Sequence, residues 1–389
     1  MRVVVDARPA LDARKTGVGH YTTHLLRALP AAAPSDEITA WYLHARGLLR
    51  PRTFFDDVAG LTEKASRFPA RLFGPLSSRL GEPRIERLVD LDVLLATNFL
   101  PPATSSPGVV LVVHDLAFRR FPETAPHMDA RWLRRFETWL TRAARIIVPS
   151  MSAAADLAED FGVDPERIDA IHHGVEAHAF RPAADAAVEE ARRRFGVPGP
   201  YALFVGGIEP RKNLERLVRA FGRLRGLDHV SLVIAGGPVR WLPKASEQLD
   251  DAIAALPAGV RSRVIRTGYV SQAEKVALMT GATLMVYPSR YEGFGFPVLE
   301  AFAAGLPVLT SNVSALPEVA GDAAELVDPE NTDAIAQALE RMLQDRDLLD
   351  NLAAAGVARV SAFTWEATAR ATVESLHRAH ETAHETTPG

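Results

Sequence analysis

The sequence predicts an α/β protein with two doubly wound domains. Apolar segments of strand length alternate with segments of helix length and 3.6-residue periodicity along the chain. Continuous apolar strands that alternate with helices are typical of parallel sheets covered on both faces. The length of 389 residues is enough for two domains that each bury their own core.

The first half carries the less regular version of this pattern. Strands are expected at 3–5, 38–43, 93–96, 109–113 and 146–148, with helices at 18–29 and 130–143. We expect this half, residues 1–180, to form one domain.

The second half repeats the alternation more cleanly. Strands are expected at 201–205, 231–235, 264–267, 284–287 and 308–310, with helices at 213–224, 246–256, 273–280 and 297–303. A stretch between Gly174 and Pro200, which is rich in proline, glycine and charge, separates the halves. We therefore place the second domain at 181–363.

Composition excludes several classes of protein. The net charge of −4 at pH 7 gives no reason to expect a nucleic-acid partner. The absence of cysteine excludes disulfides, thiolate nucleophiles and cysteine-ligated zinc, and it suits the cytoplasm. No apolar run is long enough to span a membrane, and Asp6 and Arg8 interrupt the N-terminal run, so no signal peptide is expected. The basic and aromatic stretch 46–87 could touch an anionic membrane, but a solvated insertion explains it as well.

The strongest motif is EGFGFPVLE, from Glu292 to Glu300, after the expected strand 284–287. Gly293 and Gly295 permit a tight turn with open N–H groups, and Pro297 suits the first turn of a helix. A helix N-terminus in this position suits a diphosphate, and the two carboxylates could hold hydroxyls of one extended ligand. The alternative is a glycine turn followed by an ordinary helix glutamate.

A second motif, GGIEPRKN, spans Gly206 to Asn213 after the expected strand 201–205. Lys212 is one of only five lysines, and Arg211 precedes it where a helix is expected to open. Two cations at a helix N-terminus are unfavourable unless an anion joins them, and a pyrophosphate leaving group would do so. The alternative is a solvated charged turn.

Two features of the first half are weaker. Gly17, Val18 and Gly19 are expected to form a glycine loop that approaches a ligand, although the spacing does not fit a dinucleotide fingerprint. His114 and Asp115 follow the expected strand 109–113, at the end of a strand where functional residues often lie. The alternative for His114 is a buried imidazole that binds a backbone carbonyl.

We expect no protein metal site. Asp90 and Asp92 have the Asp-x-Asp spacing of some metal-dependent sugar transferases, but they lead into a strand. His377, His380 and His384 share a helical face in a tail that is expected to fray.

Taken together, these motifs resemble retaining glycosyltransferase family 4, which has the GT-B architecture of two Rossmann-like domains facing across a cleft. The resemblance rests on Glu292-x7-Glu300, Gly206-Gly207 with Arg211-Lys212-Asn213, Gly17–Gly19 and His114-Asp115. Phe363-Thr364-Trp365-Glu366 is similar to the start of the family's closing helix, which implies that 364–389 return to the first domain. The N-terminal segment is similar to bacterial mannosyltransferases of surface-polysaccharide assembly. One departure is Ile171-His172-His173-Gly174 at the linker.

The resemblance implies roles for single residues. Arg211 and Lys212 would neutralise the departing diphosphate in place of a metal. Glu292 would hold hydroxyls of the donor sugar, and His114 and Asp115 would lie by its reacting face. The expected donor-binding residues are Gly17, Val18, Gly19, Gly207, Gly236, Tyr269, Val270, Phe294, Gly295, Phe296 and Glu300, of which Glu300 would bind the ribose.

The function implied is transfer of a hexose, with mannose from GDP-mannose favoured, to a glycan, lipid-linked or small-molecule acceptor. No cofactor is expected. Another nucleotide donor, such as UDP-hexose, stays open, as does a GT-B epimerase or phosphorylase. A non-catalytic NAD-binding protein is disfavoured because neither half has Gly-x-Gly-x-x-Gly directly after a strand.

Overall fold

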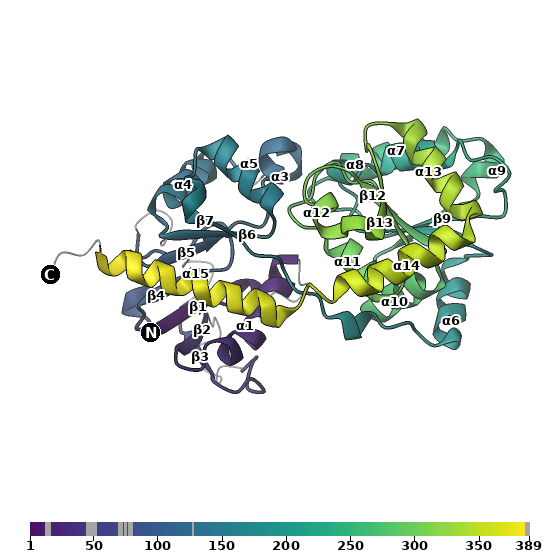
Figure 1. Ribbon diagram of the computed structural model, residues 1–389. Coiled ribbons are helices and arrows are strands. Elements are labelled where there is room, and N and C mark those ends of the chain that lie inside the picture. The colour runs from purple at the N-terminus through teal and green to yellow at the C-terminus, as the bar shows by residue number, and fades with distance from the viewer. Residues whose placement is uncertain are drawn as a thin grey trace. The chain divides into compact units, whose positions relative to one another are not determined.

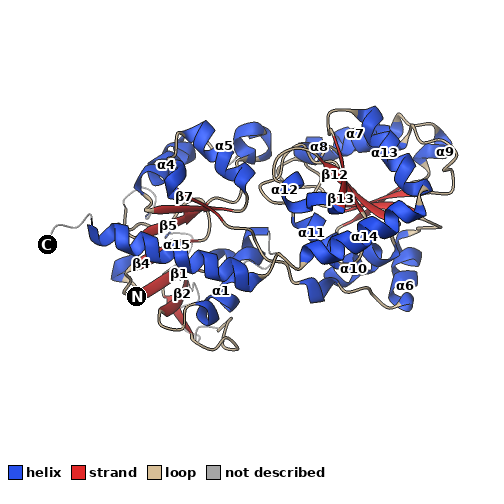
Figure 2. Cartoon of the chain, viewed as in Figure 1, coloured by secondary structure: helices blue, strands red, loops and turns tan. Residues whose placement is uncertain are grey.

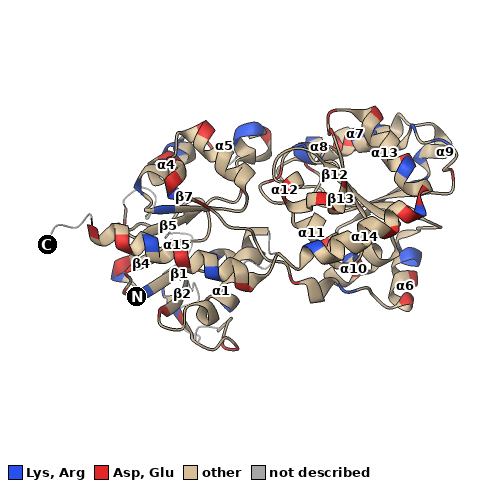
Figure 3. Ribbon diagram, viewed as in Figure 1, with Lys and Arg blue, Asp and Glu red and all other residues tan. Residues whose placement is uncertain are grey.

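A computed structural model describes residues 1–11, 17–43, 53–68, 73, 76, 81–126 and 128–385. The chain forms two compact units. The first consists of Met1–Leu116, His127–Gly174 and Phe363–Gly389, and the second of Ala117–Pro126 and Val175–Ala362. Positions of basic and of acidic residues are interspersed along the ribbons of both units (Figure 3).

The described part of the first unit contains one parallel sheet in the order β3-β2-β1-β4-β5-β6-β7. Its strands are β1 (Arg2–Asp6), β2 (Glu37–Leu43), β3 (Leu61–Ser66), β4 (Val93–Ala96), β5 (Val109–Val112), β6 (Arg145–Val148) and β7 (Ile168–Ala170). The order runs outward on both sides of β1 and β4, which is the doubly wound arrangement that the sequence predicts. Helices cover the sheet, as Figure 2 shows.

The described helices of this unit are α1 (Gly17–Ala32), α4 (Ala130–Arg142), α5 (Met151–Phe161) and α15 (Trp365–Glu385). Although α15 is the last element of the chain, it lies along α1 in the first unit (Figure 1). The Ser375 hydroxyl donates to the Asp169 carboxylate at 2.6 Å. A Cβ atom on Gly174 would lie 2.4 Å from the backbone nitrogen of Trp365, so this close approach requires glycine. The return of the C-terminal helix to the first unit is thus confirmed.

The second unit, which is described throughout, contains a six-stranded parallel sheet in the order β10-β9-β8-β11-β12-β13. Its strands are β8 (Tyr201–Val205), β9 (Ser231–Ala235), β10 (Val264–Gly268), β11 (Leu284–Tyr287), β12 (Val308–Ser311) and β13 (Ala324–Val327). Its main helices are α6 (Asp185–Phe195), α7 (Leu214–Phe221), α8 (Pro243–Ala254), α10 (Gln272–Gly281), α11 (Phe296–Ala303), α13 (Thr332–Gln344) and α14 (Arg346–Val360), with the shorter α3 (Ala117–Arg120), α9 (Ala258–Arg261) and α12 (Leu316–Ala320).

Burial explains why the central strands form. Every residue of β8, β9, β11 and β12 is buried, which matches their continuous apolar sequences. Three strands that the sequence pattern misses, β3, β7 and β13, lie at sheet edges and have mixed polar composition. The apolar-run criterion fails there because charged residues interrupt these three strands, whereas the fourth edge strand, β10, begins with consecutive apolar residues and is expected at 264–267.

Two further expectations can be compared with the structure. The C-terminal histidines belong to α15, and the His377 ring binds Asp36 at 2.8 Å, so the expectation of a frayed tail is wrong for these residues. Within the stretch 46–87, β3 joins the sheet, and residues 46–52, 69–72, 74, 75 and 77–80 lie outside the described residues. Among the described helices, none combines the length and apolar composition that crossing a bilayer demands.

Candidate active site

The two principal motifs lie at the switch point of the second sheet. The strands β8 and β11 are neighbours, and the strand order reverses between them. Ligands of open α/β sheets bind in the crevice outside the carboxyl ends of strands at such a point. The loop after β8 carries Arg211 and Lys212, and the loop after β11 carries Glu292, so this topology brings together residues about eighty positions apart.

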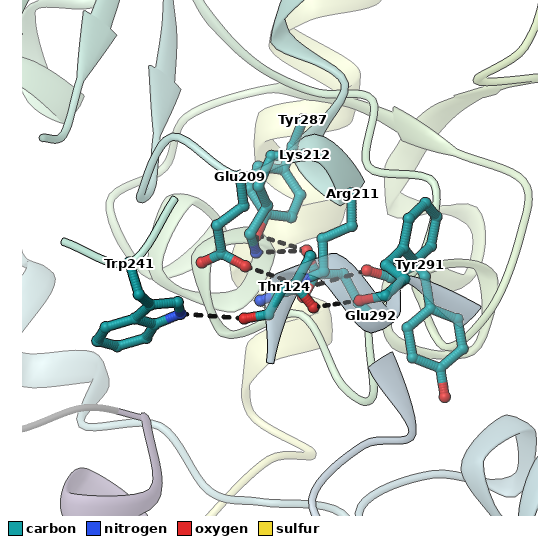
Figure 4. A network of polar contacts seen from close by, with 9 residues as sticks. Thr124, Glu209, Arg211, Lys212, Trp241, Tyr287, Tyr291 and Glu292 are labelled. Atoms are coloured by element: carbon teal, nitrogen blue, oxygen red, sulfur yellow. Dashed lines mark hydrogen bonds and ion pairs between the residues drawn. The ribbon is translucent and has the colours of Figure 1, made fainter. Parts of the chain in front are cut away.

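A buried ion-pair network joins these three side chains (Figure 4). The Arg211 Nη1 atom lies 2.7 Å from Glu292 Oε2, and Lys212 Nζ lies 2.5 Å from Glu292 Oε1. The Tyr287 hydroxyl donates to Glu292 Oε1 at 2.8 Å and accepts from Lys212. Glu209 closes the network by accepting from Arg211 Nε at 2.8 Å. Two cations therefore face two carboxylates, and their formal charges cancel.

Electrostatics fixes the ionisation of this network. Burial alone would raise the pKa of Glu292, but Arg211 and Lys212 outweigh it and lower that pKa to about 2. Burial, with the neighbouring Arg211, lowers the pKa of Lys212, and Glu292 opposes this effect. Burial, together with the charge of Glu292, raises the pKa of Tyr287 well above its ordinary value, so the phenol keeps its proton. The two cations thus favour the ionised form of the Glu292 carboxylate.

Backbone contacts hold the two loops against each other. The Arg290 N–H, in the loop after β11, donates to the Arg211 carbonyl, in the loop after β8, at 2.7 Å. The Glu292 N–H ties the loop after β11 to the segment after β12 by donating to the Ser314 hydroxyl at 3.0 Å. Asn213 adopts a left-handed conformation, with φ of 61°, between the turn and α7. Its side-chain amide donates to the carbonyls of Pro288 and Pro329, at 3.0 and 2.7 Å. The lysine-bearing turn is therefore held by the loop after β11 and by the segment after β13.

The glycine-rich loop leads into α11 as the sequence predicts. Gly295 has φ of 115° directly before Phe296, and a Cβ atom there would lie 2.9 Å from the Leu316 side chain. The ring of Phe294 is buried against that of Phe296. Within α11, both carboxylate oxygens of Glu300 lie 2.9 Å from Lys275 Nζ on α10. Glu300 and Glu292 thus have different cationic partners.

The remaining donor-binding candidates of the second unit lie on loops that follow neighbouring strands. The Gly206 N–H donates to the Ala235 carbonyl, and the Gly236 N–H donates to the Gly268 carbonyl, both at 3.0 Å. A Cβ atom on Gly236 would lie 1.9 Å from the Gly206 carbonyl oxygen, so the two loops approach closely only because the residue is glycine. Gly207 follows Gly206 in the first loop, and Tyr269 and Val270 follow Gly268 in the third, where Tyr269 is 84% exposed.

In the first unit, the expectation that Gly17–Gly19 form a loop is wrong. Gly17, Val18 and Gly19 form the first turn of α1 and not a loop. The expected helix 18–29 already contains Val18 and Gly19, and in the structure α1 begins one residue earlier, at Gly17. A Cβ atom on Gly17 would meet no atom of the described residues within 4 Å, and residues 12–16, which precede it, are not among them. The first N–H groups of a helix have no partner within the helix, so this position can offer donors to an anion.

His114 and Asp115 follow β5 as predicted. The His114 Nε2 atom lies 2.8 Å from the Thr97 carbonyl oxygen. Because a carbonyl can only accept, Nε2 carries the proton, which leaves Nδ1 as an acceptor. Burial lowers the pKa of His114 and favours the neutral ring. The ring packs against Tyr21, with centroids 5.0 Å apart, and against His173 at 5.6 Å.

Sequence reasoning missed three contributors to these sites. Tyr287 ends β11, a position that the strand-end argument used for His114 could have found. Lys275 belongs to the same small set of lysines that drew attention to Lys212. Glu209 lies inside the GGIEPRKN motif, but nothing in its spacing indicates that it binds Arg211.

The rejected metal motifs have other roles. Asp92 pairs with Arg2 at 2.6 Å beside the start of β4. In the parts of the chain that the structure describes, no three histidine, aspartate or glutamate side chains gather in a way that could hold a metal ion.

Two family models match consecutive parts of the chain. The model for Glycosyltransferase Family 4 matches residues 15–179, and the model for Glycosyl transferases group 1 matches residues 188–359. The chain belongs to glycosyltransferase family 4. The two sheets of this transferase and its returning C-terminal helix are those of the GT-B fold.

Known proteins are similar to this chain over nearly their whole length, in sequence or in structure. The transferase is 28% identical to O-antigen chain mannosyltransferase B of Escherichia coli, over 94% of this chain and 97% of the relative. It is 29% identical to the MMP alpha-(1->4)-mannosyltransferase of Mycolicibacterium hassiacum, over 93% and 95%. Among solved structures, sucrose-phosphate synthase from Thermosynechococcus elongatus has a TM-score of 0.75 at 20% identity and coverage of 98% and 99%. Anabaena HepE in complex with UDP-glucose has a TM-score of 0.68 at 16% identity, with coverage of 99% and 100%.

Proposed function

We propose that the transferase moves mannose from GDP-mannose to a glycan, lipid-linked or small-molecule acceptor, with retention of anomeric configuration and without a metal. The observation that carries the proposal is the network of Arg211, Lys212 and Glu292 at the switch point of the second sheet. The similarity to two mannosyltransferases over nearly the whole chain supports mannose.

Arg211 and Lys212 supply the charge that departure of a nucleoside diphosphate requires. As the glycosidic bond of the donor breaks, negative charge grows on the β-phosphate, and preorganised cations stabilise it most in a buried site. Lys212 has three N–H donors and Arg211 has five, so each can hold Glu292 and a phosphate oxygen together. The carboxylates keep the two cations in place before the donor arrives.

Glu292 acts as an electrostatic and positioning group. A carboxylate with a pKa of about 2, bound by two cations, is a weak base and a weak nucleophile. This argues against a covalent glycosyl-enzyme at Glu292. We propose instead that the leaving phosphate takes the acceptor proton on the face from which it departs, which gives retention.

Glu300 is the proposed ribose ligand, and the loops at Gly207, Gly236, Tyr269 and Val270 are the proposed site of the base. The Lys275–Glu300 pair supports this role because it holds the carboxylate at a fixed position on α11. The backbone at Phe294–Phe296 would contribute N–H groups to the phosphate and sugar.

In the first unit, we propose that the start of α1 faces the donor phosphates and that His114 and Asp115 lie by the sugar. The helix N-terminus supports the first assignment, and the neutral His114 ring, whose Nδ1 atom can accept a hydrogen bond, supports the second.

Gly17→Val tests the role of the α1 N-terminus. Because no atom of the described residues lies within 4 Å of a Cβ atom at this position, we expect the fold to tolerate the side chain and the melting temperature to change little. If phosphates approach there, the isopropyl group should lower transfer by about 10-fold or more, because it blocks close backbone approach. Full activity in the folded variant would remove the α1 terminus from the site.

The donor and the metal requirement can be tested together. Release of nucleoside diphosphate is followed with GDP-mannose, UDP-glucose and ADP-glucose, each in EDTA and each in magnesium. We expect GDP-mannose to be the preferred donor, with turnover in EDTA close to that in magnesium, because Arg211 and Lys212 supply the charge. Activity that only a divalent metal restores would contradict the charge argument. Preference for UDP-glucose, the ligand of Anabaena HepE, would favour the second candidate donor.

A further inference from the structure

The second unit contains a cavity of about 590 Å³ that the proposed donor site does not use. It lies between the loop 208–210, the start of α7 and the start of α8, and Trp241 and Glu123 also line it. None of the proposed ligands of the base, ribose or sugar (Gly207, Gly236, Tyr269, Val270, Glu292 and Glu300) lines it. Its volume falls within the range of about 300–1,000 Å³ that small-molecule sites occupy.

One residue joins the cavity to the ion-pair network. Glu209 lines the cavity, and its Oε2 atom accepts from Arg211 Nε at 2.8 Å. Arg211 in turn binds Glu292 (Figure 4). A ligand in the cavity would therefore lie next to the cations that we assign to the donor diphosphate.

Trp241 gives the cavity a flat apolar surface. The indole is 54% exposed, and its Nε1–H donates to the Thr124 carbonyl at 3.0 Å, as Figure 4 shows. This bond holds the polar edge of the ring, and about half of the side chain remains exposed to solvent. An exposed indole with its polar edge satisfied is suited to packing against the C–H face of a pyranose ring.

The charges of the lining favour a neutral ligand. Four basic and three acidic side chains line the cavity. Three of the four basic ones form ion pairs with acids: Arg216 and Arg290 with Glu330, and Arg219 with Glu215. A phosphate would have to compete with these carboxylates, whereas sugar hydroxyls can bind carboxylates, the Gln248 amide and guanidinium groups alike.

We propose that this cavity binds a neutral hexopyranose unit of the acceptor glycan, stacked on Trp241 and held by Glu209 and Gln248. The proposal rests on the proposed function, because it takes a glycan as acceptor. Such a subsite would make the protein bind an acceptor of several sugar units more tightly than a single sugar.

The test is binding of α-linked mannotriose to the full-length protein without donor, measured by saturation-transfer NMR and tryptophan fluorescence. The wild-type protein should bind the trisaccharide more tightly than mannose. Trp241→Ala should bind it at least about tenfold more weakly. Val357→Ala, which removes another exposed apolar side chain of the same unit, should bind as the wild type does.

Nucleoside diphosphate release from GDP-mannose in water, measured on the same variants, separates this proposal from the proposed function. Normal release with equal trisaccharide binding by wild type and Trp241→Ala would overturn the cavity assignment alone, as would the absence of binding by the wild type. Displacement of the trisaccharide by inorganic pyrophosphate would also overturn it, because it would make the cavity an anion site. Absence of release with any donor would instead count against the proposed function.

Discussion

Replacing Lys212 with alanine is expected to lower the rate of sugar transfer by about 100-fold or more and to weaken binding of a nucleoside diphosphate. Loss of one preorganised group that faces developing negative charge typically costs about 10²–10³ in turnover. Lys212 is buried and binds both Glu292 and Tyr287, so no solvent-exposed cation can replace it. Transfer and nucleotide binding are measured by diphosphate release and by calorimetry.

The same change should also destabilise the second unit. Glu292 would keep Arg211 but lose its second cation, and removal of one partner of a buried ion pair costs about 3–5 kcal/mol. Lys212→Met keeps the apolar stem and so isolates the loss of charge, and Lys64→Ala removes an exposed lysine of the first unit as the control. A folded Lys212→Met protein with full activity would contradict the assignment of the diphosphate site.

The sequence alone predicts the fold to within a few residues at the centre of each sheet. The strands 201–205, 231–235 and 284–287 match β8, β9 and β11, because these strands are buried on both faces and read as unbroken apolar runs. The edge strands β3, β7 and β13 could not be found in this way. Their polar residues reflect partial exposure, which apolar periodicity cannot distinguish from a loop.

The site could be predicted in part for a similar reason. Glycine, proline and charge at strand–turn–helix junctions identify Arg211, Lys212 and Glu292 as candidates, since local backbone rules govern those positions. Their direct pairing could not be predicted, because it depends on the adjacency of β8 and β11 and on the direction of side chains far apart in sequence. The sequence therefore indicates that Glu292 binds the sugar and that Arg211 and Lys212 separately bind the diphosphate. In the structure these three side chains form one ion-pair network.

Replacing Glu292 and replacing Glu300 are expected to have different effects on sugar transfer and on nucleotide binding, because the two carboxylates have different partners. Glu292→Gln removes a negative charge that repels phosphate and occupies Arg211 and Lys212. Transfer should fall by about 100-fold, since the cations lose their orientation and the sugar loses a ligand. Affinity for the bare nucleoside diphosphate should stay the same or rise. Glu300→Gln should lower the affinity for the bare nucleoside diphosphate by about 10-fold or more, because the ribose loses its hydrogen bond to a charged group.

Calorimetric titration of GDP into wild type, Glu292→Gln and Glu300→Gln tests most directly whether Glu292 and the donor phosphates share the same two cations. Glu325→Gln, which breaks the ion pair with Arg341 elsewhere in the second unit, is the control and should bind as the wild type does. The account predicts unchanged or tighter binding for Glu292→Gln and clearly weaker binding for Glu300→Gln. Equal weakening in both variants, or no effect in either, would contradict it.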